Sequence, residues 1–91
     1  MSLCTAEISL YPLADGYLPV IKNFIDRLSS VTEFELSVST TSTQVRGPYQ
    51  QLFEVLGSEI ERVHQTTGQA ILVCKFLAGN DVKPGLHGAH G

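Results

Sequence analysis

The spacing of apolar residues changes between two periods along the chain, and the order of these changes limits the folds it can adopt. Apolar and polar residues alternate over residues 4–11, whereas residues 17–30 carry apolar side chains at helical spacing. The later segments repeat this change, with strand patterns over residues 33–39, 42–46 and 69–77 and a helical pattern that Pro48 opens and Gly68 closes. The expected order is therefore strand, helix, strand, strand, helix, strand.

Two strand–helix–strand units in this order place both helices on one face of a sheet. The sequence therefore predicts an α+β fold, the ferredoxin-like sandwich (βαββαβ). Its four-stranded antiparallel sheet has the strand order 4-1-3-2, and its two helices lie on one face. The other sheet face is then uncovered. Alternation assigns to that face mainly polar residues: Thr5, Glu7, Ser9, Tyr11, Glu35, Ser37, Ser39, Gln44 and Arg46.

The chain is expected to form one domain over residues 1–78, followed by a flexible tail over residues 79–91. Apolar residues make up 43% of the sequence and charged residues 16%, so a buried core can form. The tail is rich in glycine and shows no periodicity. Its two histidines, His87 and His90, are too few to predict a metal site.

Charge and hydropathy exclude several classes of partner. The formal net charge is −3 and the six basic residues are scattered, so no nucleic-acid surface is predicted. No apolar run approaches the roughly 20 residues that span a bilayer, and the N-terminus lacks the regions of a signal peptide. A cytoplasmic protein without membrane insertion is expected. Cys4 and Cys74 belong to no CxxC motif and are expected to be reduced thiols on adjacent strands.

No catalytic motif occurs in the sequence. The nucleophile elbow, the zinc-protease helix, the P-loop and the dinucleotide fingerprint are all absent. His64 lies on the polar side of the second helical pattern and is expected to face solvent. The sequence therefore predicts a protein that is not an enzyme and that needs neither a cofactor nor a metal.

Hydroxyl side chains are concentrated within residues 37–43, where six of seven residues are Ser or Thr. One interpretation is a solvated hairpin, because Thr favours strands and Ser favours turns. The other is a pocket in which hydroxyls and Glu7 or Glu35 converge on a small polar ring, with Tyr11 as an aromatic wall. Hydroxyls both donate and accept hydrogen bonds, and a carboxylate accepts from an exocyclic amine. Periodicity does not decide between the two.

Four segments resemble a known family: Cys4–Leu13, Tyr17 with Ile21 and Ile25, Ser42–Gly47, and Phe53. Together they are similar to the YkoF-like thiamine/hydroxymethylpyrimidine-binding family over residues 4–77, and the Ser-Thr-x-Val-x-Gly stretch is the most telling part. The resemblance implies a ferredoxin-like domain that binds thiamine or its pyrimidine half without catalysis, in a family linked to uptake of the vitamin precursor. The namesake type carries two such domains in tandem. A chain with one domain is therefore expected to form a homodimer or homotetramer.

The leading hypothesis is non-enzymatic binding of thiamine or a related hydroxymethylpyrimidine-type small molecule. The end of the last strand and the residues that follow it, Lys75–Asp81, differ from the Ser-x-Gly-Cys-Pro-Gly-like segment of the namesake type, so the ligand could also be a different small ring. Two alternatives remain: an oligomeric interaction or regulatory module with no small-molecule ligand, and a ferredoxin-like monooxygenase, for which the sequence offers no candidate base. The expected ligand-binding residues, in order of preference, are Thr43, Ser42, Ser9, Tyr11, Ser39 and Glu7.

Overall fold

Six elements follow the predicted order in the computed structural model, which describes residues 2–79. They are β1 (Leu3–Pro12), α1 (Tyr17–Ser29), β2 (Glu35–Val38), β3 (Thr43–Pro48), α2 (Tyr49–Thr66) and β4 (Ala70–Ala78). Most boundaries fall within one or two residues of the expected ones. The predicted tail, apart from Gly79, lies outside the described residues.

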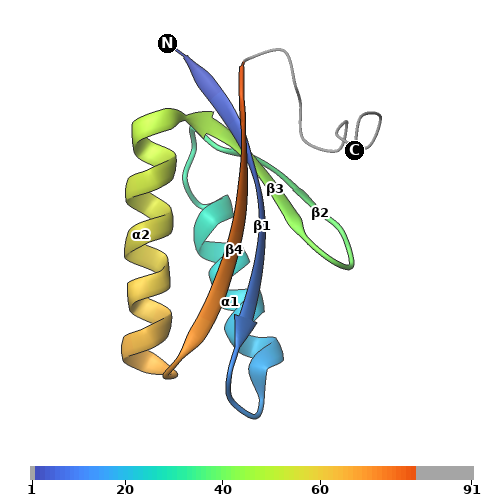
Figure 1. The fold of residues 1–91 in the computed structure, drawn as a ribbon, viewed down its shortest axis with the longest axis vertical. Coiled ribbons are helices and arrows are strands. Elements are labelled where there is room, and N and C mark those ends of the chain that lie inside the picture. The colour runs from blue at the N-terminus through green and yellow to red at the C-terminus, as the bar shows by residue number, and fades with distance from the viewer. Residues whose placement is uncertain (1, 80–91) are drawn as a thin grey trace.

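The four strands form one antiparallel sheet in the order β2-β3-β1-β4. Both helices lie against the same face of this sheet, as Figure 1 shows. The predicted ferredoxin-like βαββαβ fold, with its strand order and its single helix-covered face, is therefore confirmed.

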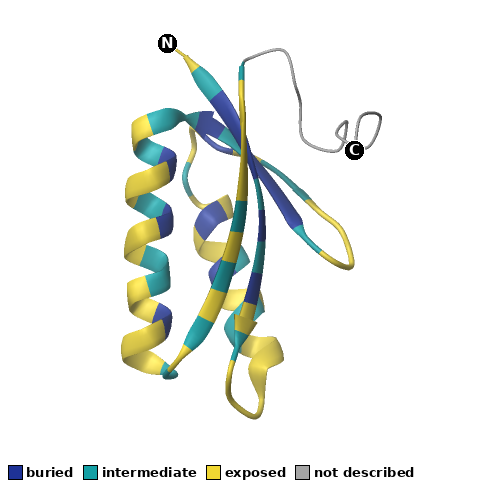
Figure 2. Ribbon diagram, viewed as in Figure 1, coloured by how far each residue is buried: buried dark blue, intermediate teal, exposed yellow. Residues whose placement is uncertain are grey.

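The core lies between the sheet and the two helices. β1 contributes every second side chain to it, from Cys4 to Leu10. The helices contribute apolar stripes that face inward, and Figure 2 shows the buried side of α2 turned towards the sheet. The buried helix residues are Phe24, Leu28, Leu52, Leu56 and Val63.

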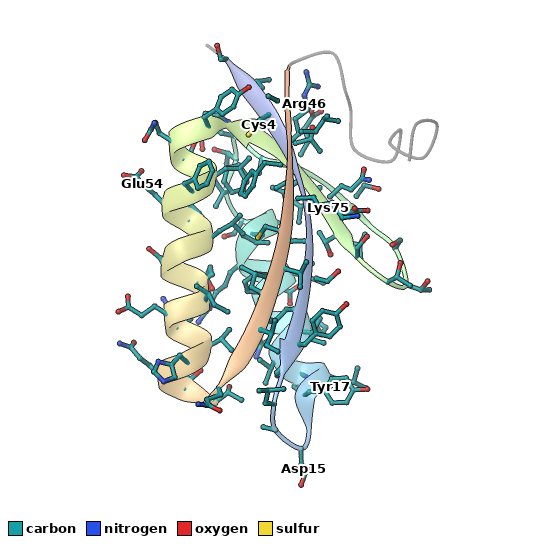
Figure 3. All side chains as sticks on the ribbon, viewed as in Figure 1. Cys4, Asp15, Tyr17, Arg46, Glu54 and Lys75 are labelled. Carbon is teal, nitrogen blue, oxygen red and sulfur yellow. The ribbon has the colours of Figure 1, made fainter. Side chains whose placement is uncertain are left out.

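Strand register separates the two faces of the sheet. Glu7 pairs with Gln44 on one side and with Lys75 on the other, so all three lie on the uncovered face. Figure 3 shows Cys4 on the helix side, and Arg46 and Lys75 on the opposite side. Ion pairs cross the strands there, from Arg46 Nη1 to Glu35 Oε1 at 3.2 Å and from Lys75 Nζ to Glu7 Oε1 at 3.8 Å. The predicted polar face is confirmed on β1, β2 and β3, whereas β4 adds the apolar residues Ile71, Val73 and Leu77 to the same face.

Three apolar residues that the sequence periodicity places on inward faces are exposed. Leu18, in the first turn of α1, is 67% exposed. Val38 is 57% exposed because it ends the short edge strand β2. Phe53 is 55% exposed because it lies on the flank of α2 nearest the other edge strand, β4. There its ring stacks on Phe76, with the ring centroids 4.4 Å apart and the planes 13° from parallel.

Cys4 and Cys74 lie on the adjacent strands β1 and β4, as expected, and both are free thiols. Their partners in the register are different residues, Ala78 for Cys4 and Ile8 for Cys74, so the two thiols are not opposite each other. Burial raises the pKa of both thiols, which keeps them protonated and unreactive. No helix within residues 2–79 has the length and apolar character needed to cross a membrane.

Candidate functional site

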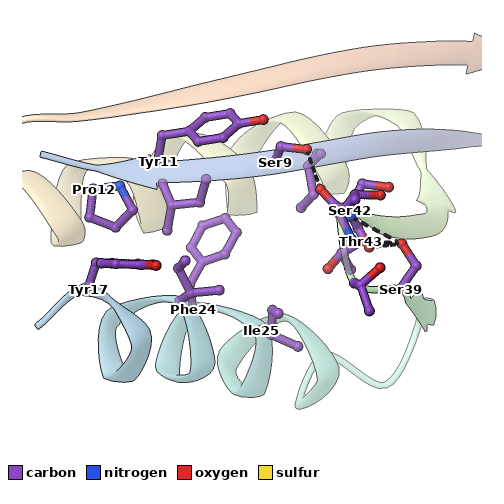
Figure 4. A pocket seen from close by; sticks show the side chains of 14 residues that line it. Ser9, Tyr11, Pro12, Tyr17, Phe24, Ile25, Ser39, Ser42 and Thr43 are labelled. Atoms are coloured by element: carbon purple, nitrogen blue, oxygen red, sulfur yellow. Dashed lines mark hydrogen bonds between the residues drawn. The ribbon is translucent and has the colours of Figure 1, made fainter.

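A pocket of about 430 Å³ opens between the end of β1, the part of α1 from Tyr17 to Ile25 and the β2–β3 turn (Figure 4). A volume of this size suits a small organic molecule. Residues of three segments line the pocket: Ile8, Ser9, Leu10, Tyr11, Pro12, Tyr17, Ile21, Phe24, Ile25, Ser39, Thr40, Thr41, Ser42 and Thr43. Of the six predicted site residues, all except Glu7 belong to this lining.

The α1 side of the pocket is apolar. Phe24 and Ile25 project from α1 towards β1 (Figure 4), and Ile21 also lines the pocket. Tyr17 borders the pocket and is about half exposed. Gly16 precedes the helix with φ of 69°, a left-handed conformation that favours glycine, and this turn brings Tyr17 beside the end of β1. These side chains offer a flat ring an apolar surface.

The opposite side of the pocket is the hydroxyl-rich turn, and Ser39 holds it together. The Ser39 Oγ donates to the Ser42 carbonyl oxygen at 2.9 Å and accepts from the Ser42 N–H at 3.1 Å. Ser9 of β1 ties the turn to the sheet, because its Oγ donates to the Thr41 carbonyl oxygen at 3.2 Å. The Ser9 and Ser39 hydroxyls therefore shape the pocket. The Ser39 Oγ accepts from the N–H groups of both Thr41 and Ser42, whereas the Ser9 Oγ retains lone pairs that can accept from a ligand.

Glu7 reaches the pocket only through Ser42. The Ser42 Oγ donates to Glu7 Oε2 at 3.3 Å, and the other carboxylate oxygen of Glu7 pairs with Lys75 at 3.8 Å. Glu7 lies on the uncovered face of the sheet, one residue before the lining begins, because alternation turns its side chain away from α1. In this geometry the carboxylate orients the Ser42 hydroxyl.

Thr43 is the most enclosed hydroxyl in the lining. It pairs with Ile8 and therefore lies on the helix side of the sheet, where it is 5% exposed. No hydrogen bond within residues 2–79 engages its Oγ1. Tyr11, by contrast, lies on the side of β1 away from α1 (Figure 4), so it borders the pocket at its rim.

Sequence reasoning did not assign the apolar part of the site. Ile21, Phe24 and Ile25 have the helical spacing of core residues, and no pattern separates a pocket wall from a core. No lining residue carries a formal charge. His64 is exposed on α2 and does not line the pocket, and within residues 2–79 no group of three or more His, Cys, Asp or Glu residues could hold a metal. The pocket is therefore suited to a neutral or weakly charged ring with polar edges.

Comparison with known families identifies one match. A sequence model of the YKOF-related family matches residues 3–81, which is most of the chain. The match includes all of the pocket lining and all six elements. No curated protein shows significant sequence similarity to the chain.

Several solved structures share the fold. A Thermotoga maritima protein, provisionally described as a thiamine biosynthesis/salvage protein, is similar with a TM-score of 0.78 and 21% identity over 88% of this chain and 90% of its own. A Streptococcus pneumoniae protein is similar with a TM-score of 0.75 and 23% identity, over 89% of this chain and 90% of its own. A hypothetical protein of Methanocaldococcus jannaschii is similar with a TM-score of 0.78 and 16% identity, over 91% of this chain and 87% of its own. At these identities the likeness establishes the fold alone.

Proposed function

The chain belongs to the YKOF-related family, and from this premise we propose that it binds thiamine or a related hydroxymethylpyrimidine-type molecule. The description of the Thermotoga maritima structure supports a role in thiamine biosynthesis or salvage. Binding of this kind would serve uptake or salvage of the vitamin precursor.

The observation that carries this proposal is the composition of the pocket. Apolar side chains of α1 face a turn rich in hydroxyls across a space of about 430 Å³. An aminopyrimidine is flat and apolar on its faces and has donors and acceptors along its edge. Its faces would contact Ile21 and Phe24, and its edge would meet Thr43 and the turn.

Binding is proposed without catalysis. A general base or nucleophile must stand within hydrogen-bond reach of the reacting atom. The pocket lining holds neither histidine, cysteine nor a carboxylate. The hydroxyls of Ser9 and Ser39 donate to backbone carbonyl oxygens. The Ser42 hydroxyl donates to the Glu7 carboxylate, which lies outside the lining and is also paired with Lys75. This favours a carrier or sensor over an enzyme.

A ligand panel tests the proposal. Thiamine, hydroxymethylpyrimidine and several nucleobases are added separately to the full chain, and thermal unfolding and calorimetry are recorded. Thiamine or hydroxymethylpyrimidine should raise the melting temperature by several degrees, because a ligand that binds only the folded state stabilises it. A flat response to both of these compounds, at concentrations up to 1 mM or so, would refute the proposal.

A second candidate function, self-association, has an observation of its own in its favour. Ile71, Val73 and Leu77 of β4 are each 45–51% exposed on the uncovered face of the sheet. A homodimer or homotetramer would bury them. Light scattering should then give at least twice the monomer mass of 9.9 kDa at micromolar concentration, and Val73→Lys should shift the mass towards the monomer. A constant mass of 9.9 kDa over a concentration series would refute self-association.

A further inference from the structure

β1 is longer than its neighbour β3, and this leaves part of β1 paired on one side only. The β1–β3 register ends at the pair of Ile8 with Thr43, whereas the β1–β4 register continues to Pro12. Within residues 2–79, no strand runs beside Ser9–Pro12 on the β3 side. The pocket occupies that place, since all four of these residues line it.

The direction of each backbone group in this segment follows from two hydrogen bonds. The Leu13 N–H donates to the Gln69 carbonyl oxygen at 2.9 Å, in line with the β1–β4 register. Residues two apart in a strand point their N–H and C=O the same way, so the backbone N–H and C=O of Tyr11 also point towards β4. The backbone N–H and C=O of Leu10 and the C=O of Pro12 must then point towards the β3 side, into the pocket.

The β2–β3 hairpin gives the same result independently. The Ser39 N–H donates to the Ser42 carbonyl oxygen at 2.9 Å, so Ser42 points its backbone towards β2. The next residue, Thr43, must point towards β1, where it pairs with Ile8. Ile8 and Leu10 are two apart in β1, so the backbone of Leu10 faces the same side and lies beyond the end of β3.

Pro12 has no N–H, and this fixes the hydrogen-bonding pattern of the free edge. The edge offers one donor, the Leu10 N–H, and two acceptors, the carbonyl oxygens of Leu10 and Pro12. Leu10 is buried, so its backbone groups lie in a setting where an unpaired donor or acceptor is costly. A ligand that brings the complementary pattern removes that cost.

We propose that this free edge of β1 recognises the ligand ring as a strand would recognise its neighbour. The Leu10 N–H donates to a ring nitrogen, and the Leu10 carbonyl oxygen accepts from an exocyclic amine beside that nitrogen. The Pro12 carbonyl oxygen lies about 6.8 Å further along the strand and is open to a donor elsewhere on the ligand. This inference rests on the proposed function and names the group of the aminopyrimidine that is read. The side chains of the turn then supply secondary contacts, and the amine–nitrogen edge of the ring determines specificity.

Amide hydrogen exchange tests the proposal residue by residue. Exchange is measured by NMR on the full chain, with and without saturating hydroxymethylpyrimidine. The Leu10 amide should exchange fast in the free protein and at least tenfold more slowly with ligand. The Tyr11 amide is the internal control, because it points towards β4 and pairs with Ile71 in both states. A Leu10 amide whose exchange is unchanged while other pocket amides shift would overturn the inference and leave the proposed function intact.

A chemical cycle separates a direct bond from simple shielding. Leu10→leucic acid replaces the Leu10 N–H by an ester oxygen, and an aminopyridine analogue replaces the ring nitrogen beside the amine by C–H. Each change alone should weaken binding about tenfold, or about 1.4 kcal/mol, and the two together should weaken it no further. Additive losses would overturn the inference. If neither ring binds the unaltered protein, the proposed function fails as well, and that outcome is distinct from the other two.

Discussion

The two ends of the β1–β3 ladder differ in how the space between sheet and helices is filled. At one end Cys4 pairs with Gly47, and the ring of Phe34 lies so close to Gly47 that a Cβ there would come 2.5 Å from Cδ1. At the other end Ile8 pairs with Thr43, and beyond that pair the pocket begins. The same two strands thus carry a closed end and an open end.

The closed end is filled by side chains, and the open end is bordered by backbone and hydroxyls. Cys4 and Phe34 are buried beside Gly47, and close packing of this kind leaves no volume to add. The open end loses a neighbouring strand where the hairpin turns at Ser39–Ser42. Stability should therefore depend mainly on the closed end and ligand affinity on the open end.

Gly47→Ala should give the largest effect. The added methyl would meet the Phe34 ring at 2.5 and 2.8 Å, so the ring or the strand must move. Overpacking of this kind costs about 1–3 kcal/mol, measured as a lower midpoint of urea unfolding. The affinity of the folded protein for the ligand should change by no more than about twofold, because Gly47 does not line the pocket.

Two variants serve as controls for Gly47→Ala. Gly57→Ala adds a methyl on exposed α2, where nothing lies within 4 Å, and should stabilise the helix by about 0.5–1 kcal/mol. Phe34→Leu combined with Gly47→Ala should be less destabilised than the sum of the single variants. Strictly additive losses would show that the clash at Phe34 is not the cause.

Discrimination against phosphate should be the next largest effect. No side chain in the pocket lining is charged, and Glu7 stands one hydrogen bond away through Ser42. We expect thiamine or hydroxymethylpyrimidine to bind at least tenfold more tightly than thiamine diphosphate, a difference of about 1.4 kcal/mol or more. Calorimetry with and without magnesium measures it. Equal affinities would indicate that backbone N–H groups in the first turn of α1, beside Tyr17, hold the phosphates.

Thr43→Val should weaken ligand binding at the open end without changing the packing at the closed end. The change keeps the shape of the side chain and removes a hydroxyl that has no partner within residues 2–79. Loss of a hydrogen bond to the ligand should cost about 0.5–1.5 kcal/mol in binding. Thr32→Val, at an exposed site outside the lining, is the matched control and should bind as the wild type does. Equal affinity of both variants would remove Thr43 from the site.

The smallest expected effect is a titration at the closed end. The Gln51 Nε2 donates to Glu33 Oε1 at 3.0 Å, and this bond lowers the pKa of the Glu33 carboxyl. Because the pKa is lowered in the folded state, the stabilisation is present above the unfolded pKa and is lost as the pH falls through the folded one. Gln51→Ala should raise the Glu33 pKa towards its ordinary value, as measured by carbon-detected NMR. An unchanged pKa would show that the hydrogen bond is not formed in solution.

The fold could be predicted because its signals are local. Alternation in residues 4–11 and helical spacing from Tyr17 onwards each specify one element, and the order of elements leaves few topologies. Periodicity predicts that Leu18, Val38 and Phe53 are buried, and this prediction is wrong because periodicity identifies a face and not how far that face is covered. Val38 ends an edge strand, and Phe53 finds an aromatic partner in Phe76 instead of the core.

The candidate site could be predicted only in part. The hydroxyl-rich turn is visible in composition, and five of the six predicted residues line the pocket. Whether they contact a ligand stays a prediction. Glu7 is the exception. Its carboxylate accepts from the Ser42 hydroxyl and pairs with Lys75, and alternation in the sequence does not show these contacts. The free backbone of Leu10 has no sequence signal at all, because it depends on where β3 ends relative to β1.

The placement of the tyrosines makes the pocket observable by its own fluorescence. The chain has three tyrosines and no tryptophan, so no stronger fluorophore masks their emission. Tyr11 and Tyr17 border the pocket, whereas Tyr49 begins α2 and its hydroxyl accepts the Gly79 N–H at 3.1 Å. An aromatic ligand in the pocket would lie close to both Tyr11 and Tyr17, quench these two of the three emitters and leave Tyr49 as a constant background. The unlabelled protein therefore carries a built-in optical reporter of occupancy.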